Sequence, residues 1–123
     1  MKVTTEKHFE IFKRECEKWI KRFGLLGHRF YYIHADGPTQ YLAYCICPNA
    51  HQDRVFTLGL SKTLNCDYSM INLKRAAFHE VMEAFLYRLN NVARCRYVVP
   101  EEIEDEVHNI IRTLENVVFE GWK

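Results

Sequence analysis

Apolar side chains recur at every third or fourth position in three segments of the chain, which is the spacing of amphipathic helices. The first predicted helix covers residues 6–23 and stops at Gly24, because glycine readily takes the left-handed conformation that ends many helices. The second covers residues 69–90, with Ser69 as its N-cap, and the third covers residues 101–119. Their predicted core faces are Phe9, Phe12, Cys16, Trp19 and Phe23 in the first helix, Phe78, Met82, Phe85 and Leu89 in the second, and Ile103, Val107, Ile110, Leu114 and Val118 in the third.

Three segments between the first two predicted helices are rich in aromatic and β-branched residues, which predicts strands. They cover residues 28–35, 41–47 and 54–60, and the connections between them are short turns and polar loops. Such short connections favour an antiparallel meander, with a parallel edge strand as the alternative. We therefore expect an α+β fold in which three helices accompany a three-stranded, mainly antiparallel sheet. Nothing divides the chain, so residues 1–123 are expected to form a single domain.

Composition and charge exclude several classes of protein. Apolar residues make up 48% of the 123 residues, which excludes a disordered chain. The formal net charge of +1 gives no electrostatic reason to expect binding to nucleic acid or to a membrane surface. No apolar run has the length of a membrane span, and the N-terminal residues do not resemble a secretion signal. We expect a cytoplasmic protein.

The five cysteines are an odd number, which favours free thiols in a reducing compartment over a set of disulfides. Cys45 and Cys47 are separated by one residue in a predicted strand and would point the same way. No second cysteine or histidine pair completes a structural zinc cluster with them. Two ordinary strand residues are the favoured interpretation of this pair.

The second predicted helix carries the sequence His79-Glu80-Val81-Met82-Glu83 at its centre. Residues four apart lie above one another on a helix, so His79 and Glu83 can offer an imidazole and a carboxylate to one point. Glu80 is placed to reach a water molecule held at that point. The arrangement is that of the zinc-peptidase motif HExxH, in which the glutamate is the general base. Here the second histidine is replaced by Glu83.

The third predicted helix carries His108 on the corresponding flank of its apolar face. If the two helices pack through these faces, His79, Glu83 and His108 can meet at the edge of the core. Two imidazoles and one carboxylate form a known catalytic zinc shell, and Glu80 would then deprotonate the metal-bound water. Glu115 could hydrogen bond a liganding histidine, and Arg112 could stabilise an oxyanion. These residues predict one zinc ion per chain.

In the order of its elements the sequence resembles a minimal zincin-fold metallopeptidase domain. The segments FHEVMEAFL and EVHNIIRTLEN are similar to those of small metallopeptidase-like proteins encoded by phages and prophages. The resemblance implies a zincin-like fold, His79, Glu83 and His108 as ligands, Glu80 as base and, for a phage protein, the host cytoplasm. It also implies that the strand from Arg54 to Leu60 is a sheet edge that receives an extended peptide or protein partner.

Other interpretations of the same residues remain open. The chain could be a catalytically inactive zincin-like module that binds a peptide or protein. A carboxylate-bridged di-metal site on Glu80, Glu83, Glu104 and His108 is less favoured, because such sites draw on four helices. The simplest alternative is an ordinary amphipathic helix with a chance His-Glu-x-x-Glu sequence, and Arg112 and Glu115 could form a surface ion pair. Substrate and oligomeric state are not predicted.

Overall fold

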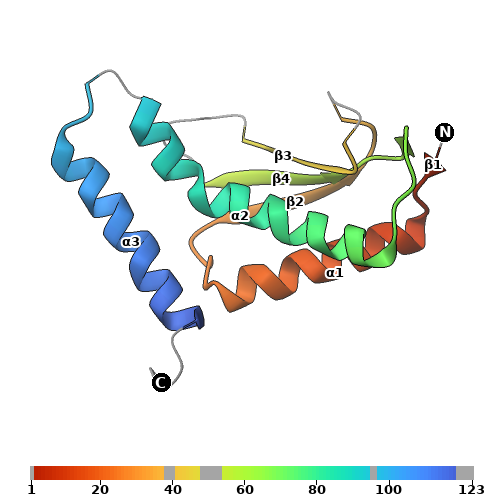
Figure 1. Ribbon diagram of the computed structural model, residues 1–123, viewed down its shortest axis with the longest axis horizontal. Helices are drawn as coiled ribbons and strands as arrows, with labels where there is room; N and C mark the ends of the chain where they lie inside the picture. Colours follow the sequence, from red (N-terminus) through yellow and green to blue (C-terminus); the bar gives the residue numbers. More distant parts are fainter. Residues whose placement is uncertain (1, 38–40, 48–53, 95–96, 119–123) are drawn as a thin grey trace.

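The computed structural model describes residues 2–37, 41–47, 54–94 and 97–118. Within these ranges the chain is an α+β protein with three helices, as expected, and it has a two-stranded sheet besides the expected three-stranded one (Figure 1). No helix in these ranges is both long and apolar enough to cross a lipid bilayer. The elements are β1 (Lys2–Val3), α1 (Glu6–Arg22), β2 (Arg29–His34), β3 (Ala43–Ile46), β4 (Val55–Leu60), β5 (Thr63–Leu64), α2 (Met70–Arg94) and α3 (Pro100–Val118).

The three-stranded sheet has the order β2-β4-β3, so the last of its strands in the sequence lies in the middle. β4 pairs in parallel with β2 over six residue pairs and antiparallel with β3 over four. The favoured antiparallel meander is therefore wrong, and the alternative of a parallel edge strand is confirmed, with β2 as that strand. The physical reason is burial: β4 carries Phe56, Leu58 and Leu60, each at most 2% exposed, and the most apolar strand takes the position that water reaches least.

The central position of β4 also corrects the expected binding edge. The segment from Arg54 to Leu60 was predicted to be the edge that accepts a peptide, but β4 is hydrogen bonded to a neighbour on both sides. A strand with both sides paired has no free backbone groups to offer to another chain. In the described sheet the two edges are β2 and β3.

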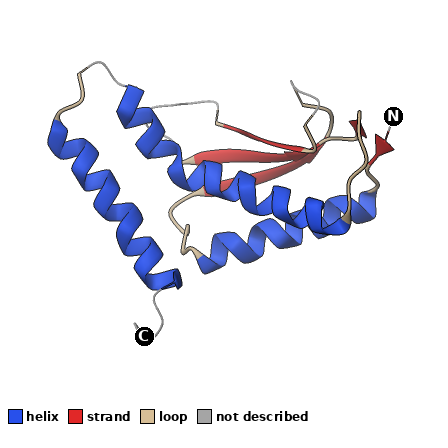
Figure 2. Cartoon of the chain, viewed as in Figure 1, coloured by secondary structure: helices blue, strands red, loops and turns tan. Residues whose placement is uncertain are grey.

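Helices α1 and α2 pack side by side and cover one face of this sheet, α1 next to β2 and α2 next to β3 (Figure 2). The side chains between these layers form the core, and aromatic contacts such as Trp19 with Phe78, at 4.8 Å between ring centroids, join the two helices. The largest fully buried side chains include Phe12, Leu58, Leu60, Leu73 and Val81.

The buried face of α2 is rotated from the predicted one. Its centre is formed by Leu73, Ala77, Val81 and Ala84, whereas the predicted centre at Phe78 is only half-buried. The helix packs against two partners at once, the sheet and α1, and its larger rings contact aromatic residues of α1 and of the turn after it. The rotation carries His79 and Glu83 to the open side of the helix and turns Glu80 towards the sheet.

A second, two-stranded sheet pairs β1 with β5, and neither of these short strands was predicted from the sequence. Thr4 fixes it to the main sheet, since its hydroxyl donates to the carbonyl of Ser61 and lies 2.7 Å from Nε2 of His34. The Asp36 carboxylate accepts hydrogen bonds from the backbone of Lys62 and Thr63, and these bonds hold its pKa below the usual range.

Helix α3 extends from the end of α2 at an angle to it, and none of its residues is buried (Figure 1). The apolar face predicted as its core face is largely open, with Ile103 37% and Val118 68% exposed. The side turned to the rest of the chain includes Glu106, Thr113 and, from the predicted core face, Ile110, all partly buried. The predicted packing of α3 through its apolar stripe is therefore seen only at Ile110, and the rest of the stripe is exposed.

Candidate functional site

The start of α2 fixes the orientation of the His-Glu-x-x-Glu segment. Ser69 caps the helix as predicted: its hydroxyl accepts from the backbone N–H of Asn72 at 3.2 Å. The Asn72 side-chain oxygen accepts from the Ser69 backbone N–H at 2.9 Å, so each residue satisfies a donor of the other. From this cap the helix continues without a break through Glu83.

His79 and Glu83 lie together on the open side of α2, as their spacing predicted. Nε2 of His79 is 3.2 Å from Oε1 of Glu83, and the two side chains are 67% and 57% exposed. Such an exposed pair stabilises a helix by only a few tenths of a kcal/mol. Its nitrogen and oxygen atoms therefore remain accessible to a ligand from solution.

Glu80 has a different environment from its neighbours in the sequence, because its side chain points towards the sheet. The residue is only 8% exposed. Burial raises the pKa of its carboxyl to about 7, an effect that His79 partly offsets and Glu83 reinforces. A carboxyl with a pKa near neutrality can both accept and return a proton under physiological conditions, which suits a general acid or base.

A groove of about 520 Å³ lies where the first half of α2 meets the start of β3. Glu80 and His79 line its helical side together with Asn72 and Arg75, and the chain from Tyr41 to Ala43 lines the other. This wall leads directly into β3, an edge strand of the sheet. The groove thus combines a buried carboxyl, an exposed imidazole and a neighbouring strand that lacks a partner on one side in the described sheet, and Glu83 contacts the imidazole from outside the groove lining.

The Cys45 thiol lies near the same carboxyls. Burial, and to a smaller extent Glu80 and Glu83, raise the pKa of this thiol to about 12. At neutral pH it is therefore a protonated thiol, which is neither a nucleophile nor a metal ligand in that state. The Cys45 side chain thus packs against the core from β3, which agrees with its interpretation as an ordinary strand residue.

The remaining predicted site residues lie on α3, and none of them lines this groove. Nδ1 of His108 is 2.9 Å from the backbone carbonyl oxygen of Glu104, within its own helix. Arg112 donates to the side-chain oxygen of Asn109 at 3.0 Å. Glu115 is exposed. Sequence periodicity placed these residues on one flank of α3, but it could not determine where that flank lies relative to α2.

The donor atoms can be compared with what a catalytic zinc ion requires. His79 and Glu83 supply two suitable ligands at suitable spacing, whereas such sites use three protein ligands and a water molecule. Among the described residues no group of three or more His, Cys, Asp or Glu side chains is placed to hold a metal ion. His108 therefore does not join the pair in this arrangement, and the described residues provide part of the predicted shell.

Two groove residues, Asn72 and Arg75, escaped the sequence analysis. Asn72 precedes His79 by seven positions, or two helical turns, and Arg75 precedes it by four, or one turn. Both therefore lie on the same side of α2 as His79. That spacing was a usable signal for Arg75. The proximity of Tyr41 was not readable, because it depends on how β3 is placed under the helix.

Comparison of the chain with protein-family models, with curated proteins and with solved structures finds no match.

Proposed function

We propose that this chain is a metal-dependent peptide hydrolase whose active site is the groove between α2 and β3. The observation that carries the proposal is the placement of Glu80: a buried carboxyl at the wall of the groove, next to the exposed His79 and Glu83 pair. Burial of a carboxyl destabilises the fold whenever the group is ionised. Such perturbed acidic groups are found mainly at functional sites, where the chemistry requires them. The adjoining edge strand supports an extended substrate.

In this proposal His79 and Glu83 hold a zinc ion, and His108 remains the candidate for a third ligand. When bound, the metal would polarise a carbonyl and make a water molecule acidic. For His108 to reach His79 and Glu83, α3 would have to pack against α2 in a different position. The absence of buried residues on α3 is compatible with this, because little apolar burial holds the helix in place.

Glu80 has two tasks in the proposed reaction. It accepts a proton from the attacking water, and in the metal-free chain burial already raises its pKa towards neutrality. It then returns the proton to the leaving amine. Arg75 lines the same groove and is the cation nearest in sequence to the site, so it is our candidate to orient a substrate carbonyl or carboxylate.

The substrate in this proposal is an extended peptide that aligns with the outer edge of β3. An edge strand presents unpaired backbone groups, and a peptide can satisfy these groups by adding a strand. This position replaces the one first expected on β4. Because backbone atoms make most of the contacts, affinity would depend on an extended conformation more than on particular side chains.

A second function is favoured by the incomplete ligand set. A non-catalytic module could bind a peptide at the same edge without metal, with His79 and Glu83 as a surface pair. The two functions share the groove but differ in their dependence on metal and on Glu80. They can therefore be separated by the same set of variants.

The test is zinc stoichiometry, measured by plasma mass spectrometry and titration calorimetry on untagged protein. We expect about one zinc per chain in the wild type, loss of binding in His79→Ala and Glu83→Ala, and weaker binding in His108→Ala. Glu102→Ala is the matched control, because it removes an exposed helical carboxylate outside the groove. Failure of the wild type to bind supplied zinc would overturn the metal-dependent proposal.

Peptide cleavage and peptide binding are then compared in the Glu80→Gln variant. For a hydrolase, this variant keeps zinc and still binds an unstructured peptide library but no longer cleaves it. For the binding module, wild type and Glu80→Gln bind the library equally well with or without a chelator, and neither cleaves it.

A further inference from the structure

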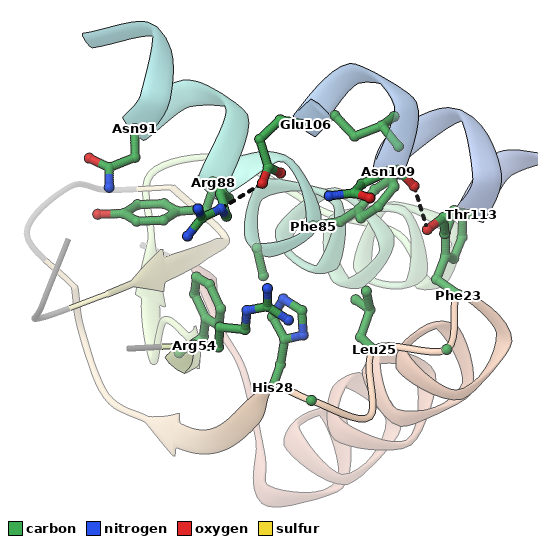
Figure 3. Close-up of a pocket in the computed structure, with 16 residues that line it drawn as sticks. Phe23, Leu25, His28, Arg54, Phe85, Arg88, Asn91, Glu106, Asn109 and Thr113 are labelled. Atoms are coloured by element: carbon green, nitrogen blue, oxygen red, sulfur yellow. Dashed lines mark hydrogen bonds and ion pairs between the residues drawn. The ribbon is translucent and has the colours of Figure 1, made fainter. Parts of the chain in front are cut away.

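A second pocket, of about 360 Å³, lies away from the groove, where the later turns of α2 face α3 and the ends of two strands (Figure 3). Its walls come from the turn after α1, the residue preceding β4, the second half of α2 and the inner side of α3. Its volume lies within the range of small-molecule sites, about 300–1,000 Å³. None of the residues proposed for peptide hydrolysis lines it.

His28 lines this pocket and carries one unsatisfied polar atom among the described residues. Its Nδ1 is buried and has no hydrogen-bond partner in the described part of the chain. The ring stacks near Phe56, at 5.7 Å between centroids, and near Phe30, at 6.1 Å, so aromatic packing fixes its orientation. A buried polar atom without a partner is costly, and a ligand that supplies the partner would remove this cost.

Two arginines and one carboxylate set the charge of the pocket. Nε of Arg88 donates to Oε1 of Glu106 at 2.6 Å, so this pair spans α2 and α3 and is balanced. Arg54 has no carboxylate within ion-pair distance in the described ranges, and Figure 3 shows its guanidinium beside the His28 ring. Burial, and then Arg54, lower the pKa of His28. Among the described residues, the pocket therefore presents one cation without an acidic partner, next to an imidazole whose pKa is lowered.

The rest of the lining is largely apolar. Phe23, Leu25, Phe56 and Phe85 all line the pocket. Phe23 and Phe85 contact each other, with ring centroids 5.6 Å apart, and so form one apolar wall. Small-molecule sites typically combine such apolar walls with a few convergent polar groups that orient the ligand.

We propose that this pocket binds a small monocarboxylate with an apolar or aromatic body, whose carboxylate is held by Arg54 and His28. The guanidinium matches a carboxylate geometrically, because it offers parallel N–H donors to both oxygens. Nδ1 of His28, in the tautomer that carries hydrogen on this atom, donates the third hydrogen bond. The apolar body occupies the space between Phe23, Phe56 and Phe85. This site is independent of the peptide groove and of any metal.

The first test uses 3-phenylpropanoate and its neutral analogue 3-phenylpropanamide as probes of the full-length chain. Binding is followed by calorimetry and by nuclear magnetic resonance of the His28 ring protons. We expect saturable binding of the carboxylate, at least about tenfold tighter than that of the amide, because charge-assisted hydrogen bonds are the stronger kind. The His28 ring resonances should shift on addition of the carboxylate.

Variants distinguish this pocket from nonspecific anion binding. Arg54→Gln should remove the preference for the carboxylate over the amide, whereas Arg29→Gln should keep it. Arg29 is a matched control because it is an exposed arginine one pairing position from Arg54 at the same end of the sheet. Circular dichroism verifies that both variants are folded. Equal affinity for the two probes, an unchanged preference in Arg54→Gln, or no saturation of carboxylate binding would each overturn the proposal.

Discussion

Replacement of Glu80 by glutamine should stabilise the protein at neutral and alkaline pH. Glu80 is nearly buried, and its pKa of about 7 lies above the usual value of 4.5, mainly because burial disfavours the charged form. Glutamine has almost the same shape but no charge to desolvate. The variant therefore removes an unfavourable electrostatic contribution while it keeps the packing of α2 against the sheet.

The magnitude follows from proton linkage. At about 1.4 kcal/mol per pKa unit, the rise from 4.5 to about 7 corresponds to about 3 kcal/mol. Between these two values the folded protein binds the proton and the unfolded chain does not, so stability falls as the pH rises. The cost is almost absent below about pH 4, and it approaches about 3 kcal/mol by about pH 7.5. This is a substantial share of the stability of a small domain.

The assay is urea denaturation of wild type and Glu80→Gln at a series of pH values from 4 to 9. Other titrating groups contribute equally to both proteins, so the difference between the two free energies of unfolding isolates Glu80. We expect a difference near zero at pH 4 that increases to about 3 kcal/mol above pH 7.5. Glu102→Gln, an exposed carboxylate on α3, should show no comparable pH dependence.

A difference that does not change with pH would refute the reasoning. It would mean that the Glu80 carboxyl titrates in the folded protein as it does in the unfolded chain, so burial does not perturb it. Its proposed duty as a proton acceptor tuned to neutral pH would then lose its physical basis.

Three further substitutions test the packing. Gly59→Ala should lower the free energy of unfolding by about 1–3 kcal/mol in urea denaturation, because a Cβ there overlaps the Tyr44 ring. In the double variant with Tyr44→Ala, the loss should be smaller than the sum of the losses in the two single variants. Phe12→Ala empties a fully buried position and should cost about 3–5 kcal/mol, and a loss below 1 kcal/mol would contradict its core placement. Thr5→Ala removes the α1 cap and should lower the free energy of unfolding by about 1 kcal/mol, measured against Thr5→Ser as control.

The helices and strands were largely readable from the sequence because their signals are local. Residues 6–23 were predicted to be helical, and α1 covers Glu6–Arg22 with Gly24 at a φ of 67° just beyond its cap. The Ser69 cap and the three main strands were also predicted correctly to within a few residues. The two-residue strands β1 and β5 were not, because strands this short carry no periodicity.

The candidate site could be predicted only in part, because the sequence contains local signals but not the packing of distant segments. His79 and Glu83 are one helical turn apart, so helix geometry alone places them together at 3.2 Å. Whether His108 approaches them depends on the packing of α3 against α2, and a helical wheel contains no information about it. The predicted apolar face of α3 was correct as a pattern but remains exposed instead of packed.

The sequence by itself determined the three helices and the three longer strands, where α1 and α2 begin, and that an imidazole and a carboxylate share one face of α2. These properties follow from contacts between residues a few positions apart. The tertiary structure alone decided that β4 is the central strand, that Glu80 is buried while His79 is open, and that His28 and Arg54 meet in a pocket. Each of these depends on which apolar surfaces are buried against one another, and that outcome is set by the whole chain at once.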